Sequence, residues 1–464
     1  MKSIDRSVKQ LLWMAALGAA GVAPAFGAGF ALLEQSASGL GRSFAGSAAV
    51  ADDATTIFFN AAGLAELNSQ AVVGASLVDI DSKFHSDLVS VAAAGQTSVG
   101  GDGGNAGGLN TVPSAYLAWR LSPRLVAGLG VNAPYGLKTE YDNGWVGRFQ
   151  ALKSDVKTLN INPTLAWRLS DRWSFGIGAD QQHIKATLSS NVNVAAALLN
   201  TLTTMYANSQ ISQGNYLTAA AASYDLTGTS TVTGSDNAWG WNAGALFKAT
   251  DNTRIGVSYR SAISYHIRGD VNFDLPGSTN PYVAGIIATA GVGQLADGPV
   301  SLDLKLPALA IASLTHKLTD RAAVMADVSW TGWSSVPALN IVRDSGTTLS
   351  STPEKWKDTW RYALGADCQV SDSWVLRVGA AYDQSPVPDS TRTPRLPDAD
   401  RTWLSAGASW KPNQTLVIDA GYAHLIAKDA KLDQDNGSEA AYGLIDGVQK
   451  SSIDIFALQA HLNF

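Results

Sequence analysis

Few residues of this 464-residue chain have the types and spacing that catalysis or metal binding requires. The six histidines show neither an HExxH pattern nor any paired spacing suited to a metal ion. Cys368 stands alone, so neither an internal disulfide nor a cysteine-based zinc cluster can form. Asp344-Ser345-Gly346 is not part of a GxSxG nucleophile motif. The sequence therefore predicts no enzyme activity, no metal site and no cofactor.

Two apolar stretches could instead bind hydrophobic molecules. The region from about residue 189 to 237 contains NVAAALLNTLTTMY, and the region from about 276 to 299 contains PYVAGIIATAGVGQLA. Both are too apolar for ordinary solvated loops, and exposed apolar patches usually mark binding sites. The alternative is that the two loops pack on each other as a lid.

The N-terminus has the composition of a secretory signal. Three basic residues precede the apolar run LLWMAALGAAGVA. In Ala25-Phe26-Gly27, the first and third residues are small and lie three and one positions before the expected cleavage site. We therefore expect residues 1–27 to be a signal peptide and the mature chain to begin at Ala28. The formal net charge of −6 argues against a nucleic-acid partner.

From about residue 70 onward, the chain alternates between apolar and polar positions as half-buried strands do. Trp173, Phe175 and Ile177, for example, are separated by serine and glycine. The mean hydropathy of +0.02 excludes a protein with many apolar helical spans. It suits a membrane barrel, in which lipid-facing and lumen-facing residues alternate. A soluble sandwich also alternates, so this pattern alone leaves both folds open.

Short polar turns separate these segments in a regular order. Six turns alternate with seven longer connections, which gives fourteen strands. Short turns at one end and long loops at the other are typical of bacterial outer-membrane barrels, whose sheet must close because open edges cannot lie in hydrocarbon. We therefore predict an all-β fold, a 14-stranded antiparallel transmembrane β-barrel, over residues 70–464. The six turns are 121–124, 169–172, 249–252, 318–321, 370–373 and 411–414.

Tryptophan placement favours the barrel over the sandwich. Rings recur within about three residues of the short turns, where a belt at the periplasmic membrane surface would place them. In a soluble sandwich the same tryptophans would be core residues. These residues are Trp119, Trp167, Trp173, Trp374 and Trp410.

Residues 28–69 do not alternate. They are rich in glycine and alanine, and Asp52 or Asp53 could cap a short helix. Fourteen strands enclose more space than one layer of side chains fills. We therefore expect this partly helical segment to plug the lumen.

Several blocks of the chain resemble one family. AGFALLEQSASGLGRSFAGSAAVADDATTIFFNAAGLA is similar to the N-terminal plug, or hatch, of the FadL family, outer-membrane transporters of long-chain fatty acids and other hydrophobic compounds. Further similar blocks are WGWNAGALFKATDNTRIGVSYRS, KWKDTWRYALGADCQVSDSWVLRVGAAYDQSPVP and LPDADRTWLSAGASW. One departure is Asn60-Ala61-Ala62, where the family commonly has Asn-Pro-Ala, so this turn lacks the proline that would make it rigid.

The resemblance implies a kink in the third strand that opens the wall sideways, at Asn132, Ala133, Pro134, Tyr135 and Gly136. The residues themselves point the same way, because Pro134 cannot donate a ladder hydrogen bond and Gly136 weakens a strand. The alternative is a strand that ends early into its loop.

The resemblance also implies an internal ligand pocket. Ala28, Gly29 and Phe30 would point into it, with Lys357 and, in a similar neighbourhood, Lys185 as cations for a carboxylate; the two lysines could equally form structural salt bridges. The family's hydrophobic outer groove corresponds to the region of Leu198, Leu199, Ile286 and Ile287.

We therefore expect an outer-membrane uptake channel for long-chain fatty acids or similar hydrophobic molecules. The alternatives are a transporter of aromatic or alkane hydrocarbons and, less in keeping with a plug, a general diffusion porin. We expect a monomer surrounded by outer-membrane lipid and lipopolysaccharide.

Overall fold

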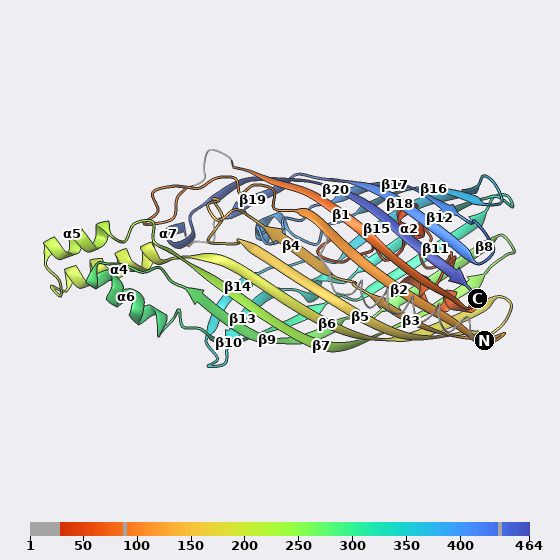
Figure 1. The fold of residues 1–464 in the computed structure, drawn as a ribbon, viewed down its shortest axis with the longest axis horizontal. Coiled ribbons are helices and arrows are strands. Elements are labelled where there is room, and N and C mark those ends of the chain that lie inside the picture. Colours follow the sequence, from red (N-terminus) through yellow and green to blue (C-terminus); the bar gives the residue numbers. More distant parts are fainter. Residues whose placement is uncertain (1–27, 87–90, 435–438) are drawn as a thin grey trace.

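The computed structural model describes residues 28–86, 91–434 and 439–464; the expected signal peptide, residues 1–27, lies outside them. The chain forms a closed antiparallel barrel of fourteen strands, with the C-terminus at one rim and a group of helices beyond the other (Figure 1). This confirms the predicted fold class. Across the described ranges, no helix is both long enough and apolar enough to cross a membrane.

Eight of the fourteen strands are continuous. The first and last strands pair along the whole first strand, from Gln70 opposite Asn463 to Ser86 opposite Gly447, which closes the barrel. The continuous strands are β1 (Gln70–Ser86), β2 (Gly108–Ser122), β5 (Lys153–Arg168), β6 (Trp173–Asn193), β7 (Thr227–Lys248), β16 (Trp374–Asp383), β17 (Arg401–Trp410) and β20 (Ile445–Asn463).

The other six strands are each interrupted once. They are β3 (Leu125–Asn132) with β4 (Gly136–Glu140), β8 (Thr253–Arg260) with β9 (Ile263–Asp274), β10 (Gly298–Leu306) with β11 (Leu309–Lys317), β12 (Ala322–Thr331) with β13 (Ala338–Arg343), β14 (Thr348–Pro353) with β15 (Thr359–Gln369), and β18 (Leu416–Ala427) with β19 (Ala430–Gln434). Three of these interruptions build the site described below.

The six predicted turns lie at the rim that carries the C-terminus. The second long loop, predicted at about 276–299, lies at 275–297, but the predicted bounds of the first, about 189–237, were too wide. β6 continues to Asn193 and β7 begins at Thr227, paired in register throughout, because serine, threonine and valine alternate there and suit an extended ribbon. The connection at 344–347 is also as short as a turn.

Three helices follow the extended strands, and the sequence reasoning had assigned these regions to loops. They are α4 (Val194–Ala207), α5 (Gln213–Ala221) and α6 (Pro281–Gly291), and they project beyond the barrel (Figure 1). Each begins at a polar cap, Asn193, Ser212 or Asn280, whose side chain accepts a backbone hydrogen bond. A fourth short helix, α7 (Glu439–Tyr442), precedes the last strand.

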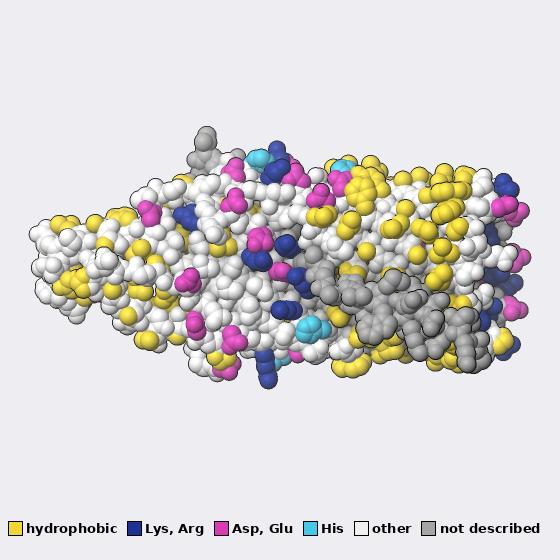
Figure 2. All heavy atoms as spheres, viewed as in Figure 1, with side chains coloured by type: hydrophobic (Ala, Val, Ile, Leu, Met, Phe, Trp, Pro, Cys, Tyr) yellow, Lys and Arg dark blue, Asp and Glu magenta, His cyan; other side chains and the backbone are white. Residues whose placement is uncertain are grey.

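The outer face of the barrel is apolar over a broad band (Figure 2). The five tryptophans beside the short turns are between 41% and 48% exposed, so they face outward rather than into a core. The inner face carries buried polar side chains such as Asn160, Asp180 and Gln182. A soluble sandwich would bury its apolar face, so this inversion matches a lipid-facing barrel.

Residues 28–69 lie inside the barrel and are almost wholly buried. They include α2 (Ala37–Leu40), α3 (Thr56–Phe59) and the 3-10 helix η2 (Ala61–Glu66). Inward-facing glycines make room for this segment. A Cβ built on Gly379 would lie 2.2 Å from the backbone carbon of Arg42, and one on Gly256 would lie 1.8 Å from the oxygen of Ala48. Only glycine allows the backbones to approach this closely.

We predict that Gly379→Val displaces this internal segment without unfolding the barrel, because valine suits a strand but its side chain would overlap Arg42. The ion conductance of the purified protein in a planar bilayer should rise, while its circular dichroism stays that of a β-protein. Gly285→Val is the matched control, since nothing lies within 4 Å of a Cβ built there. A conductance equal to that of the unaltered protein would contradict the prediction, and large steady currents before any substitution would indicate an open porin.

Candidate ligand pocket and wall break

An aromatic cage inside the barrel surrounds the ring of Phe30. The centroid of this ring lies 5.1 Å from that of Trp333, 5.8 Å from Tyr135 and 5.9 Å from Trp356. All four side chains are buried, and the rings meet at tilted or edge-to-face angles, which are favourable. The ring of Phe30 is thus buried among three aromatic side chains.

Three strand interruptions supply the other three rings of the cage. Tyr135 lies between β3 and β4, Trp333 lies in the 3-10 helix η3 (Trp333–Ser335) between β12 and β13, and Trp356 lies between β14 and β15. A regular strand must point every second side chain outward, whereas an interrupted strand can turn consecutive residues inward. The breaks thus allow large rings to meet inside the barrel.

The interruption at Ala133–Tyr135 leaves a gap in the barrel wall. β3 pairs with both β2 and β5, but β4 pairs with β5 alone, and the pairing of β2 with β3 stops at Ala115 opposite Val131. The strand resumes at Gly136, so it does not end early into its loop. The backbone groups at the break need partners because hydrocarbon offers none.

The internal segment provides those partners. Leu32 donates its amide to the Pro134 oxygen at 2.8 Å, and Gly136 donates its amide to the Phe30 oxygen at 2.9 Å. The Gln35 side chain donates to the Ala133 oxygen, also at 2.8 Å. The stretch that carries the caged ring therefore also completes the wall from inside.

The start of the described chain is fixed beside the cage. Gly29 donates its amide to Asp398 at 2.8 Å, and Asp398 forms a buried ion pair with Arg401. Gly29 has a φ of +64°, and a Cβ there would lie 2.7 Å from Trp333, so only glycine fits. Ala28 precedes this anchor directly.

Glu34 is a buried carboxylate in the same stretch. Neither of its oxygens accepts a hydrogen bond from any other residue in the described ranges, and its side chain faces the charges of Arg361, Arg401 and Asp383. Burial, only partly opposed by the backbone amide of Glu34 itself and by the two arginines, raises the pKa of Glu34 to about 7. Its charge therefore changes near neutral pH.

The two predicted lysines lie outside the aromatic cage. Lys357 is exposed although its neighbour Trp356 is buried, and Lys185 is exposed on the outer face of β6 beside inward-facing Ile184. Arg361 and Arg401 are instead the buried cations near Glu34. Side chains alternate along a strand, so the residue after the outward-facing Trp360 must point inward. The sequence pattern alone could therefore have identified Arg361 as an inward-facing cation.

The predicted outer-groove residues pack among the projecting helices. Leu198 of α4 is buried with Val283 of α6, and Ile286 and Ile287 pack against the same cluster. Leu199 is half-buried against Gly95. These contacts fit the alternative in which the two loops pack on each other, and they leave other apolar side chains exposed, such as Leu217 of α5.

Asn60-Ala61-Ala62 forms a tight turn without a proline. The Asn60 side chain accepts from the Ala62 amide at 3.0 Å and donates to the Ala48 and Ala245 oxygens. Ala61 packs so closely that a Cβ on Gly176 would lie 2.3 Å from its carbonyl carbon. Side-chain hydrogen bonds of Asn60 therefore hold this turn in the absence of the proline found in the resembling motif.

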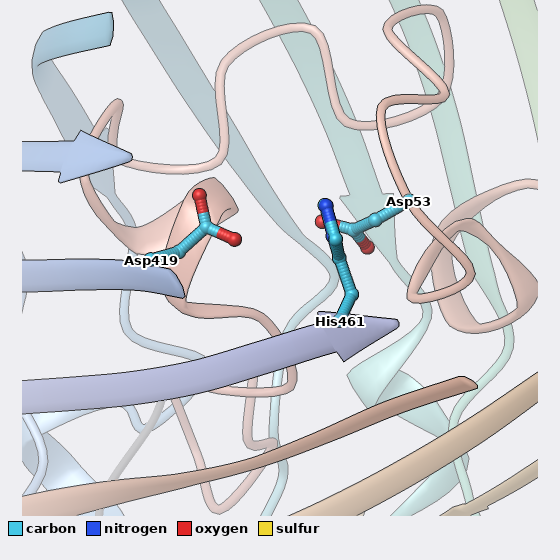
Figure 3. A group of neighbouring side chains, drawn as sticks. All are labelled: Asp53, Asp419 and His461. Carbon is cyan, nitrogen blue, oxygen red and sulfur yellow. The ribbon is translucent and has the colours of Figure 1, made fainter. Parts of the chain in front are cut away.

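Asp53, Asp419 and His461 converge where the internal segment meets β18 and β20 (Figure 3). Their donor atoms lie within 4.8 Å of one another, as in a metal site. The Gln459 amide nitrogen, however, donates to both carboxylates, at 2.9 Å and 3.1 Å. Its oxygen accepts from the Ala37 amide, which fixes the amide orientation. We therefore interpret this cluster as an anchor between segment and wall.

Comparison with known proteins places these features in context. The family described as "Outer membrane protein transport protein (OMPP1/FadL/TodX)" matches residues 18–464. The long-chain fatty acid transport protein of Escherichia coli K12 is 31% identical over 412 residues, covering 88% of this chain and 90% of that protein.

Two solved structures share the fold. A FadL homologue from Pseudomonas aeruginosa superposes with a TM-score of 0.82 and 28% identity, covering 94% of this chain and all of that one. The toluene transporter TodX of P. putida has a TM-score of 0.66 at 16% identity, covering 93% of this chain and 99% of that one, which shows a common fold.

We predict that docking of the internal segment weakens as the pH rises. Because the pKa of Glu34 is about 7 when buried and 4.5 when exposed, the docked state binds the proton more tightly. Docking is strongest below pH 4.5 and loses up to about 3 kcal/mol between pH 4.5 and 7. Channel openings in a planar bilayer should be more frequent at pH 8 than at pH 5.

Glu34→Gln should abolish this difference, because an amide stays neutral at both values. Glu66→Gln is the matched control, since Glu66 lies in the same segment but is exposed. An opening frequency that depends equally on pH in all three proteins would refute the assignment to Glu34.

Proposed function

Because this chain belongs to the OMPP1/FadL/TodX family of outer membrane transport proteins, we propose that it takes up hydrophobic small molecules, with long-chain fatty acids as the preferred class. The observation that carries the proposal is the double role of Phe30. Its ring occupies the aromatic cage, and its backbone closes the wall break at Gly136. A ligand that displaces the ring would also loosen the wall.

This coupling addresses the difficult step of transport, which is release. Burying each methylene group stabilises a bound chain by about 0.8 kcal/mol, so a sixteen-carbon tail gains on the order of 10 kcal/mol. Capture is therefore easy. Release requires a change of pocket shape, and movement of the Phe30 segment would supply it by shifting the population of pocket conformations.

We propose a route with three stages. Apolar side chains around α4, α5 and α6 capture the molecule at the outer end. Residues 28–69 act as the hatch that shapes the internal pocket in the barrel of residues 70–464. The molecule then leaves sideways through the break at Asn132–Gly136 into the membrane and crosses no water-filled pore.

The charges favour a carboxylate-bearing ligand. Arg361 and Arg401 are buried near Glu34, and we propose that they serve the role first expected of Lys357 and Lys185. Protonated Glu34 would avoid repelling the carboxylate. The second candidate is transport of aromatic hydrocarbons, which the aromatic walls of the cage favour.

We further propose that the protein carries out no catalysis, needs no cofactor and works as a monomer among outer-membrane lipid and lipopolysaccharide. Its localisation is the outer membrane. The family is a transport family. Arg401 forms an ion pair with Asp398, and Arg361 donates a hydrogen bond to the Ser43 oxygen of the hatch.

We predict that the purified protein binds a sixteen-carbon fatty acid more tightly than toluene or a sixteen-carbon alkane. Trp356→Ala should weaken fatty-acid binding by about tenfold, because it removes one wall of the cage. Trp239→Ala is the control, since that ring is 68% exposed on the outer face. Native mass spectrometry in detergent measures all three ligands. Equal retention by both variants would exclude the cage as the ligand site.

We also predict that Pro134→Val with Gly136→Val slows uptake into cells by about tenfold and leaves binding in detergent unchanged, because strand-forming residues favour continuous pairing across the break. Pro163→Val is the control, as Pro163 lies within the uninterrupted strand β5. Uptake at the normal rate by the double variant would rule out the sideways exit.

A further inference from the structure

Lysines occupy opposite positions on neighbouring strands of the outer face. Lys157 of β5 is the register partner of Lys185 of β6, and Lys83 of β1 is the partner of Lys450 of β20. Alternation places all four on the outward face, and three of them are exposed, with Lys157 half-buried. Lys and Arg side chains gather just past the edge of the hydrophobic band (Figure 2).

The depth of these lysines matches lipid head groups. Lys157 lies ten residues along β5 from Trp167 of the tryptophan belt, and Lys185 lies twelve residues along β6 from Trp173. With a rise of about 3.3 Å per residue and a tilt of about 40°, both lie about 25 to 30 Å above the belt. The apolar band of such barrels is about 25 Å tall, so the lysines stand at its outer edge.

Each pair carries a positive charge that the wall balances only in part. Like charges directly opposite each other destabilise a sheet. Asp155 contacts Lys157 at 3.1 Å and Asp81 contacts Lys83 at 2.9 Å. Within the described ranges, no ion pair is formed by Lys185 or Lys450. Two lysines and one carboxylate give each pair a net charge of +1, which one further anion would neutralise.

The two pairs flank the wall break. Lys157 is the register partner of Gly136, where the strand resumes, so the first pair adjoins one side of the break. On the other side, β2 borders the break and pairs with β1, which carries Lys83. Two molecules, one bound at each pair, would therefore lie on the two sides of the proposed exit.

We propose that each lysine pair binds a phosphate group of a phosphorylated glycolipid of the outer leaflet, so that two lipid molecules frame the break. Lysine ammonium groups bind phosphate as compact charges, and basic residues at a membrane surface attract anionic lipid at about 1 kcal/mol each. The sites face outward at head-group depth, which suits an anchored lipid. The position beside an exit rests on the proposed function, whereas the binding itself rests only on the outer-membrane location.

The test uses the full protein in detergent with bis-phosphorylated lipid A as the probe. Native mass spectrometry should show two bound lipid molecules. Lys157→Gln with Lys185→Gln should remove one, Lys83→Gln with Lys450→Gln should remove the other, and all four changes should lower retention at least about tenfold. Lys248→Gln with Lys317→Gln, at the opposite rim, is the control with the same change of charge and should retain both lipids.

Three outcomes would overturn the proposal. The lysine variants could retain lipid A like the unaltered protein, dephosphorylated lipid A could bind equally well, or a sixteen-carbon fatty acid could displace lipid A from the unaltered protein. Fatty-acid binding in the cage, measured in the same spectra, should be unchanged in the lysine variants. Failure of the lipid sites is therefore distinguishable from failure of the transport proposal, which Trp356→Ala tests.

Discussion

The structure depends on one constraint, that every backbone N–H and C=O within the hydrocarbon layer must have a partner. Pairing of β1 with β20 meets this constraint by closing the sheet. At Ala133–Tyr135 the wall cannot meet it, because β4 lacks a partner on the side of β2. Backbone groups of Phe30 and Leu32 take over there. The internal segment is thus part of the wall as well as a filling for the lumen.

The same segment is fitted to the rest of the barrel by close backbone contact. Inward glycines such as Gly379 and Gly256 remove side chains where the segment approaches. Arg42 then forms ion pairs with Asp367 of β15 and with Asp52 of its own segment. Shape and charge favour one docked position of the segment, and the buried Glu34 carboxylate, only partly stabilised by two arginines, works against that position at high pH. A docked state with one opposing interaction is suited to a part that has to move.

Sequence reasoning reached the barrel because alternation and turn chemistry are local. It found the fourteen strands, the six turns and the outward tryptophans, and it marked Pro134 and Gly136 because both residues disturb a strand by themselves. It missed Trp333 and Trp356 as cage residues, since their meeting depends on breaks in strands far apart in sequence. The lysine expectations rested on resemblance, whereas the alternation of β6 places Lys185 on the outward face. The α4–α6 helices were hidden because apolar composition alone does not distinguish a loop from a helix.

The extended pairing of β6 and β7 has an evolutionary consequence. The two strands stay in register from Trp173 opposite Phe247 to Asn193 opposite Thr227, well past the head-group level. This ribbon holds α4 and α5 beyond the barrel by main-chain hydrogen bonds, and the packing of Leu198 of α4 on Val283 of α6 adds to that support. Exposed side chains of the helices can therefore change without altering the dimensions of the cage near Phe30.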